Sequence, residues 1–277
     1  MSAPDAIGGK AAAGSSFYAG MRVLPQPERH AMYAIYAFCR AVDDIADDQA
    51  GAPAGRGQAL DQWRADLDAL YAGGDAGQAS YLTPHVRAFG LKRADFEAVI
   101  DGMAMDVARD ICWPSEAELD LYCDRVASAV GRLSVRVFGM DEAPGIALAH
   151  HLGRALQLTN ILRDIDEDAA IGRVYLPLEP IEAQGIAVGD IARVVGDPRI
   201  DGVARIVAAQ ARAHYAEADR ILATRPRGHL IAPRLMSAAY GQLLRRMEAQ
   251  GWAAPRQRVR HNRLALLWTL VRLRLGR

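Results

Sequence analysis

Two acidic segments of the sequence carry side chains whose types and spacing could bind metal ions. The first lies between Tyr33 and Asp48. On a helix, at about 100° per residue, four of its polar side chains fall within about 60° of one another. They are Tyr36, Arg40, Asp43 and Asp47. An exposed acidic helix face usually carries lysines one turn away, and this segment has none.

The second segment aligns amide and carboxylate oxygens in the same way. Within about 80° on one helix face, it places Gln157, Asn160, Asp164 and Asp168. Leucines and isoleucines flank these residues and indicate that the helix is largely buried. Two carboxylates one turn apart need a neutralising cation in an apolar wall. Because the donors are oxygens, they favour a hard ion, with Mg²⁺ as the first choice.

Each acidic run, taken alone, is also typical of a solvated helix end. Aromatic and amide side chains in phase with the acids favour the metal-binding interpretation when both runs are considered together. Two such helices facing each other in a bundle could hold several Mg²⁺ ions, and these could bind a substrate diphosphate. Arg40 and Arg163 would add charge-assisted hydrogen bonds to that diphosphate.

The elements that must position these residues are predicted to be helices. Alanine, leucine and arginine recur at spacings of three to four, and alternating β-branched runs are missing, which indicates an all-α fold. Clusters of glycine and proline divide the chain into about eight to ten helices. Ser115 and Glu118 form a capping-box pattern that opens the helix carrying Tyr122 and Cys123. Since no break resembles a linker, we expect one domain over residues 1–277, with residues 1–14 flexible.

Composition excludes several classes of protein. Hydrophobic residues make up 51% of the 277 and charged residues 24%, which is an ordinary globular balance. The net charge of zero argues against a uniformly basic nucleic-acid binder. The three cysteines form no C-x-x-C pair, so we expect reduced thiols. The N-terminus lacks signal-peptide features, and the apolar run 264–271 is too short to span a bilayer, so we interpret the chain as cytoplasmic.

Histidines offer no evident metal site. Of the seven, only His150 and His151 are adjacent. Neighbouring side chains on a helix diverge by about 100°, so we expect packing or surface roles for both rings.

Basic charge is concentrated at the C-terminus. Residues 225–277 hold twelve arginines and one acid, Glu248. We expect a basic helix over residues 255–277, in which arginines precede a leucine-rich stretch. This order suits peripheral contact with an anionic surface such as the inner membrane. The alternative is that the helix packs on the rest of the fold and its arginines pair with acids there.

Several motifs resemble the head-to-head prenyl synthases, the family of squalene, dehydrosqualene, phytoene and presqualene diphosphate synthases. The motifs are Ser16-Phe17 with Leu24-Pro25, AIYAFCRAVDDIAD from Ala34, YCDRVASAVG from Tyr122, LQLTNILRDIDED from Leu156, GRVYLP from Gly172, and Tyr240. Together with DGMAMD from Asp101, they look most like the presqualene diphosphate synthase branch of bacterial hopanoid pathways.

This resemblance implies an isoprenoid-synthase fold, a helical barrel with a central apolar cavity lined by aromatic residues, which binds two farnesyl diphosphates. The implied ligands of several Mg²⁺ ions are Asp43, Asp44, Asp47, Asn160, Asp164 and Asp168. The implied substrate-binding residues are Ser16, Phe17, Arg40, Gln157, Asn160, Arg163 and Arg173. The implied catalytic residues are Tyr36, Arg40, Tyr175 and Tyr240.

One departure from the family pattern bears on the product. Squalene-type members carry a tyrosine one or two places after the Tyr-Cys pair, where this chain has Asp124 and Arg125. The sequence also lacks a Gly-rich dinucleotide fingerprint. We therefore expect a reaction that stops at presqualene diphosphate without NADPH and supplies downstream squalene-forming enzymes. The alternatives are a squalene, hydroxysqualene or phytoene-type synthase, and a non-enzymatic assembly factor, which the two intact aspartate motifs disfavour.

Overall fold

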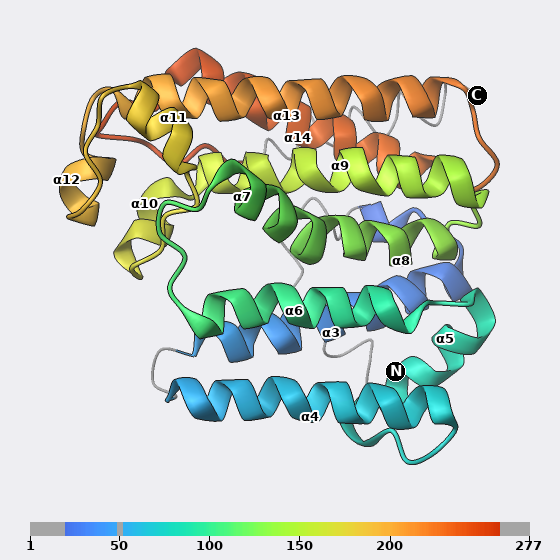
Figure 1. The fold of residues 1–277 in the computed structure, drawn as a ribbon. Helices are drawn as coiled ribbons and strands as arrows, with labels where there is room; N and C mark the ends of the chain where they lie inside the picture. The colour runs from blue at the N-terminus through green and yellow to red at the C-terminus, as the bar shows by residue number, and fades with distance from the viewer. Residues whose placement is uncertain (1–19, 49–51, 261–277) are drawn as a thin grey trace.

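The computed structural model of the chain describes residues 20–48 and 52–260. Over these ranges the protein is all-α, with no strand beyond one isolated bridge between Cys112 and Val174, and the predicted fold class is confirmed (Figure 1). The long helices are α3 (Gln26–Asp47), α4 (Pro53–Ala72), α6 (Arg93–Ala108), α9 (Glu142–Arg163), α13 (Ile200–Ala223) and α14 (Ile231–Gln250). The shorter ones are α5 (Thr83–Phe89), α7 (Glu116–Cys123), α8 (Ala129–Val137), α10 (Ile165–Ala170), α11 (Leu178–Ala183) and α12 (Ile191–Val195).

These twelve α-helices exceed the eight to ten expected from the sequence. The surplus comes from α11 and α12, which have six and five residues. They lie in a stretch whose glycines indicate a loop rather than a helix. Buried Ile181, Val194 and Val195 hold them against the core, so tertiary packing overrides weak local propensity.

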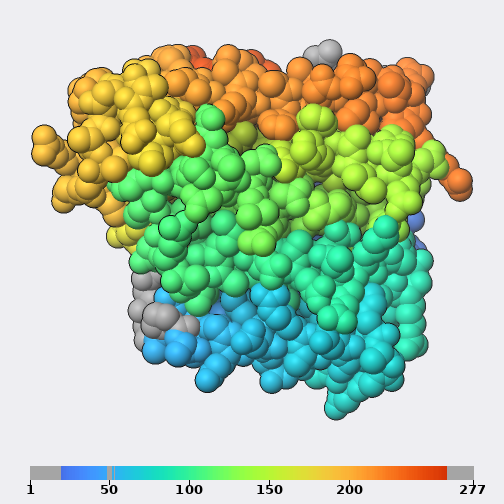
Figure 2. All heavy atoms as spheres, in the orientation of Figure 1, coloured from blue at the N-terminus to red at the C-terminus, as the bar shows by residue number. Residues whose placement is uncertain are grey.

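The helices pack in layers around an interior space. α13 and α14 lie against α9, α8 lies beside α9, and α6 packs on α3 and α4 (Figure 1). Seen from the same side in the space-filling view, side chains fill the gaps between the ribbons and close this face (Figure 2). The interior space therefore does not open through the centre of this face.

Small residues bring the helices next to α9 unusually close. A Cβ atom added at Gly153 would lie 2.7 Å from the backbone of Ser128, and one at Gly131 would lie 3.0 Å from Cα of Ala149. Ser128 ends a single π-helical turn (Asp124–Ser128) that joins α7 to α8. Only glycine at these two positions allows α8 and the π turn to reach α9 at this distance.

The ends of several elements test the sequence-based predictions. The capping box is confirmed, since the Ser115 side chain accepts from the backbone N–H of Glu118 and the Glu118 carboxylate accepts from that of Ser115. The single helix expected through the second acidic segment is wrong, because α9 ends at Arg163 and Asp164 (φ −107°, ψ 18°) separates it from α10.

The C-terminal helix does not begin at residue 255 as expected. Residues 251–260 form no helix, because Trp252 and the arginines after it pack against α9 and α10 in an irregular segment. Residues 261–277, residues 1–14, and Ser16 and Phe17 lie outside the described residues. Among the described helices, none combines the length and apolar character that crossing a membrane requires.

Candidate active site

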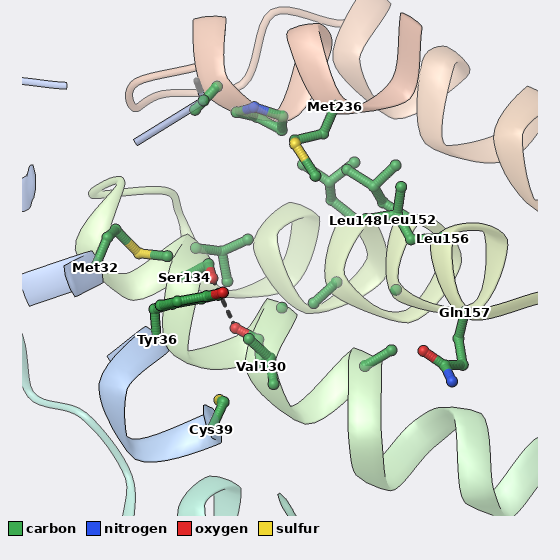
Figure 3. A pocket seen from close by; sticks show the side chains of 18 of the residues that line it. Met32, Tyr36, Cys39, Val130, Ser134, Leu148, Leu152, Leu156, Gln157 and Met236 are labelled. Atoms are coloured by element: carbon green, nitrogen blue, oxygen red, sulfur yellow. Dashed lines mark hydrogen bonds between the residues drawn. The ribbon is translucent and has the colours of Figure 1, made fainter. Parts of the chain in front are cut away.

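An apolar cavity of about 370 Å³ lies between α3, the π turn, α8, α9 and α14. Leu148, Leu152 and Leu156 form the α9 wall, and Met32 and Met236 approach from α3 and α14 (Figure 3). Most of the walls are aliphatic. Among the described residues, three aromatic side chains contribute the expected aromatic lining: Tyr36, Phe138 and Tyr240.

One end of the cavity is polar and includes residues from both acidic segments. Of the predicted site residues that the structure describes, five line the cavity: Tyr36, Asp43, Gln157, Asn160 and Tyr240. The Ser134 hydroxyl also faces the cavity. It donates to the carbonyl of Val130, so its hydrogen is already used and the apolar part gains no free donor (Figure 3). The cavity thus has an apolar body suited to a hydrocarbon chain and an oxygen-rich end.

The first acidic segment lies on one continuous helix, α3, as predicted. The Arg40 guanidinium donates to Asp43 and to Asp44, each at 2.5 Å. Asp44 is mostly exposed, whereas Asp43 is partly buried. Asp47 accepts instead from Arg173, at 2.6 Å.

The second acidic segment is bent at Asp164. Asp164 accepts hydrogen bonds from Arg163 and from Arg258, the latter at 2.6 Å. Although burial raises its pKa, these two guanidinium groups hold the pKa of Asp164 below its ordinary value. Asp168 lies on α10, one turn beyond the bend.

Arg173 joins the two segments. Its backbone N–H donates to the carbonyl of Asp168 at 2.9 Å, and its guanidinium donates to Asp47 and to the carbonyl of Ala46. Only 4% of the surface of Arg173 is exposed, so its hydrogen bonds form a buried link between α3 and the chain after α10. This contact brings the two acidic segments to the same end of the cavity.

The carboxylates at this end are not fully neutralised by the protein. Burial and the neighbouring Asp47 raise the pKa of Asp43 to about 6. Burial and the neighbouring Asp164 raise the pKa of Asp168 to about 7. In addition, Oδ1 of Asn160 is buried without a hydrogen-bond partner. A hard cation would satisfy these oxygens, so the donor set fits Mg²⁺.

A buried polar cluster behind the acidic segments was not predicted from the sequence. Asp106 accepts hydrogen bonds from the hydroxyl groups of Tyr175, at 2.9 Å, and Tyr122, at 3.1 Å. Burial raises the pKa of Asp106, although Arg173 and both hydroxyl groups oppose the shift. Tyr175, expected at the reaction site, lies here and lines a smaller neighbouring cavity. The Asp101–Asp106 and Tyr-Cys motifs contain two members of this cluster, but their spacing does not indicate that they meet.

Two arginines of the C-terminal segment also escaped prediction as site residues. Arg258 pairs with Asp164 and Glu167, and Arg256 pairs with Asp166 at 2.5 Å. The alternative expected from the sequence, that arginines of this segment pair with acids in the rest of the fold, is confirmed for these two residues. Which acids they meet depends on the return of the chain across α10.

The comparisons with known proteins agree with this arrangement. The squalene/phytoene synthase profile matches residues 10–265. The chain belongs to this family. Among family members, the presqualene diphosphate synthase of Zymomonas mobilis is 65% identical, over 94% of this chain and 89% of its own length. The presqualene diphosphate synthase of Rhodopseudomonas palustris is 55% identical, over 90% of this chain and 89% of its own length.

Solved structures of family members show the same fold. A squalene synthase from Alicyclobacillus acidocaldarius superposes with a TM-score of 0.73 at 27% identity, covering 85% of this chain and 89% of that one. A dehydrosqualene synthase in complex with a ligand superposes with a TM-score of 0.76 at 25% identity, covering 94% of this chain and 91% of that one. The helical barrel expected from the family resemblance is confirmed.

Proposed function

We propose that this chain is a presqualene diphosphate synthase, a prenyltransferase that condenses two farnesyl diphosphates head to head and releases pyrophosphate. The observation that carries the proposal is the joining of both acidic segments by Arg173 at the polar end of an apolar cavity. The names of the relatives that are 65% and 55% identical support the choice of product.

Mg²⁺ is the cofactor of this proposal. The residues that would hold it are Asp43, Asp47, Asn160, Asp164 and Asp168. The raised pKa values of Asp43 and Asp168 and the unpartnered amide oxygen of Asn160 fit a cation. Asp44 would contribute through Arg40, which it shares with Asp43. Bound Mg²⁺ would supply positive charge to the diphosphate as the allylic C–O bond breaks.

The chain's own residues position the reactants. Arg40 and Arg163 would donate to the departing diphosphate from the two acidic segments. The aliphatic walls keep water from the farnesyl cation, and Tyr36 and Tyr240 offer ring faces worth about 0.5–2 kcal/mol each in cation–π attraction. The double bond of the second farnesyl diphosphate attacks C1 of the cation, and loss of a proton closes the cyclopropane. The released pyrophosphate, or a water held by a tyrosine hydroxyl, accepts that proton.

The product test is incubation with farnesyl diphosphate and Mg²⁺, with and without NADPH. We expect presqualene diphosphate and pyrophosphate in both reactions, because Asp124 is committed to Arg132 and Arg154 where squalene-type members carry tyrosine. Conversion of most product to squalene on adding NADPH would contradict the assignment. Condensation of a longer prenyl diphosphate to a phytoene-type product would instead favour assignment as a phytoene synthase. The phytoene synthases are more distant relatives, and the enzyme of Synechocystis is 36% identical.

We also propose that the chain works at the surface of the inner membrane and passes its product to squalene-forming enzymes. The twelve arginines of residues 225–277 support contact with anionic lipid. Part of that charge is used internally, since Arg256 and Arg258 pair with acids on and beside α10. The remaining arginines would make the contact.

A further inference from the structure

Three histidine side chains meet on the outer side of α9 and α13. His150 and His151 come from α9 and His214 from α13, and each can place one ring nitrogen so that all three nitrogens lie within 4.8 Å of one another. The Nδ1 atoms of His151 and His214 are 3.0 Å apart. The expectation that adjacent histidines diverge is wrong here, because the rings of His150 and His151 lie edge to face with centroids 4.7 Å apart.

This cluster takes no part in the proposed prenyl transfer. None of its members lines the main cavity. His150 is exposed, and His214 borders a separate surface hollow that also includes Asp120 and Gln210. The site is therefore open to solvent and distinct from the aspartate segments.

The electrostatic surroundings keep the rings in the form that binds metals. Burial and the neighbouring His151 and His150 lower the pKa of His214 to about 4, and burial lowers that of His150. Neutral imidazole is the ligand form, so at neutral pH no proton has to be displaced from these two rings.

The charged groups facing the cluster are compatible with a bound cation. Arg154, also on α9, donates to Asp120 on α7 and to Asp124 on the π turn, and these two carboxylates offset its charge. The negative charge of Asp120 interacts electrostatically with both His150 and His214. Glu217 on α13 interacts in the same way with His151. The cluster thus has acids on more than one side.

We propose that His150, His151 and His214 form a binding site for one divalent transition-metal ion, with Zn²⁺ as the best fit. Tetrahedral bonds of about 2.0–2.1 Å to three imidazole nitrogens place those nitrogens about 3.3–3.4 Å apart, which small rotations of these side chains reach. Imidazole ligands select Zn²⁺, Ni²⁺ or Cu²⁺ over Mg²⁺, so the ion held here differs from the one expected at the aspartates. Bound metal would fasten α13 to α9, the helix that carries Gln157 and Asn160.

The test is zinc titration of the full chain without a histidine tag. The protein is first freed of transition metals with a chelator and then kept in millimolar Mg²⁺, which occupies the aspartate segments. We expect one Zn²⁺ per chain by calorimetry, a raised Tm, and Co²⁺ absorption bands typical of nitrogen ligands. His214→Ala should weaken zinc binding about 100-fold or more, because it removes a direct ligand. His229→Ala, at an exposed histidine beside Glu28, is the matched control and should bind as the wild type does.

His150→Ala provides a second variant at an exposed position, in case His214→Ala fails to fold. Circular dichroism of each variant checks its helix content. Wild-type protein that takes up no Zn²⁺, or His214→Ala and His150→Ala proteins that bind it as tightly as the His229→Ala control, would overturn the proposal. Because zinc is measured directly, the result does not depend on prenyl transfer.

Discussion

Among single residues, Asp168 shows how a buried carboxylate that we propose as a metal ligand lowers the stability of the metal-free fold. Its pKa is raised to about 7 in the folded chain, against an ordinary value near 3.8. Between these pH values the folded state keeps a proton that the unfolded state releases. Stability of the metal-free protein therefore falls as pH rises through this window, and the full penalty applies above pH 7.

Replacing Asp168 by asparagine should separate stability from activity. At pH 8 without metal, we expect Asp168→Asn to raise the free energy of unfolding by about 2 kcal/mol, a gain that shrinks at pH 5. The same change should abolish most prenyl transfer, because it removes a proposed Mg²⁺ ligand. Thermal denaturation in chelator and product assays measure the two effects. Asp61→Asn, at an exposed acid of α4, is the control, and a lower Tm for Asp168→Asn at pH 8 would contradict the argument.

Arg258 is the residue-scale test of the C-terminal segment. Its guanidinium reaches Asp164 and Glu167 across α10, so it lies where a diphosphate bound to the acidic segments would carry charge. We expect Arg258→Gln to raise KM for farnesyl diphosphate about tenfold with a smaller effect on kcat, as loss of one charge-assisted contact does. Arg260→Gln, two residues along the same segment, is the control. Equal steady-state constants for both variants would assign Arg258 a structural role alone.

At the scale of elements, the approach of the π turn to α9 depends on Gly153. A Cβ there would lie 2.7 Å from backbone atoms of Ser128, which cannot move aside as a flexible side chain could. The same helix carries Leu148, Leu152 and Leu156 into the cavity wall. Displacing α9 would therefore alter both packing and cavity shape.

We expect Gly153→Ala to lower the free energy of unfolding by about 1–3 kcal/mol, the usual effect of overpacking. Gly57→Ala in α4 is the matched control, since no atom lies within 4 Å of its added Cβ and alanine favours a helix by about 1 kcal/mol. Urea denaturation of both variants measures the difference. If Gly153→Ala were as stable as Gly57→Ala, the close approach of the π turn to α9 would not contribute to the free energy of unfolding.

Across the whole molecule, charge is divided unevenly along a chain of zero net charge. The twelve arginines of residues 225–277 balance an excess of acids in the rest of the chain. Residues 252–260 are anchored, because the indole N–H of Trp252 donates to the carbonyl of Leu162 at 2.9 Å. A truncation that tests membrane contact should therefore end after Arg260 and keep this anchor.

We expect the full chain to pellet with anionic vesicles at low salt and to be released at high salt, because each cation near the surface contributes about 1 kcal/mol that salt screens. Neutral vesicles should bind it weakly. The chain ending at Arg260 should pellet much less while keeping the same Tm. Equal pelleting of the two chains would place the contact elsewhere, and no pelleting with anionic lipid would refute it.

The sequence by itself determined the helical class and the side-chain types that the acidic segments present. The position of Tyr36, Asp43 and Asp47 on one helix follows from periodicity alone, because hydrogen bonding fixes 3.6 residues per turn wherever a helix forms. The Ser115 and Glu118 cap is equally local and was predicted correctly. The family motifs carried the resemblance that the profile match and the relatives confirmed.

Only the tertiary structure decided which distant residues meet. The bend at Asp164, the tie from Arg173 to Asp47, and the return of Arg258 to Asp164 join residues up to 126 positions apart. The meeting of His214 with His150 and His151 depends in the same way on how α13 lies along α9. Spacing along the chain carries no information about such contacts, because they arise from the packing of whole helices and the burial of their apolar faces.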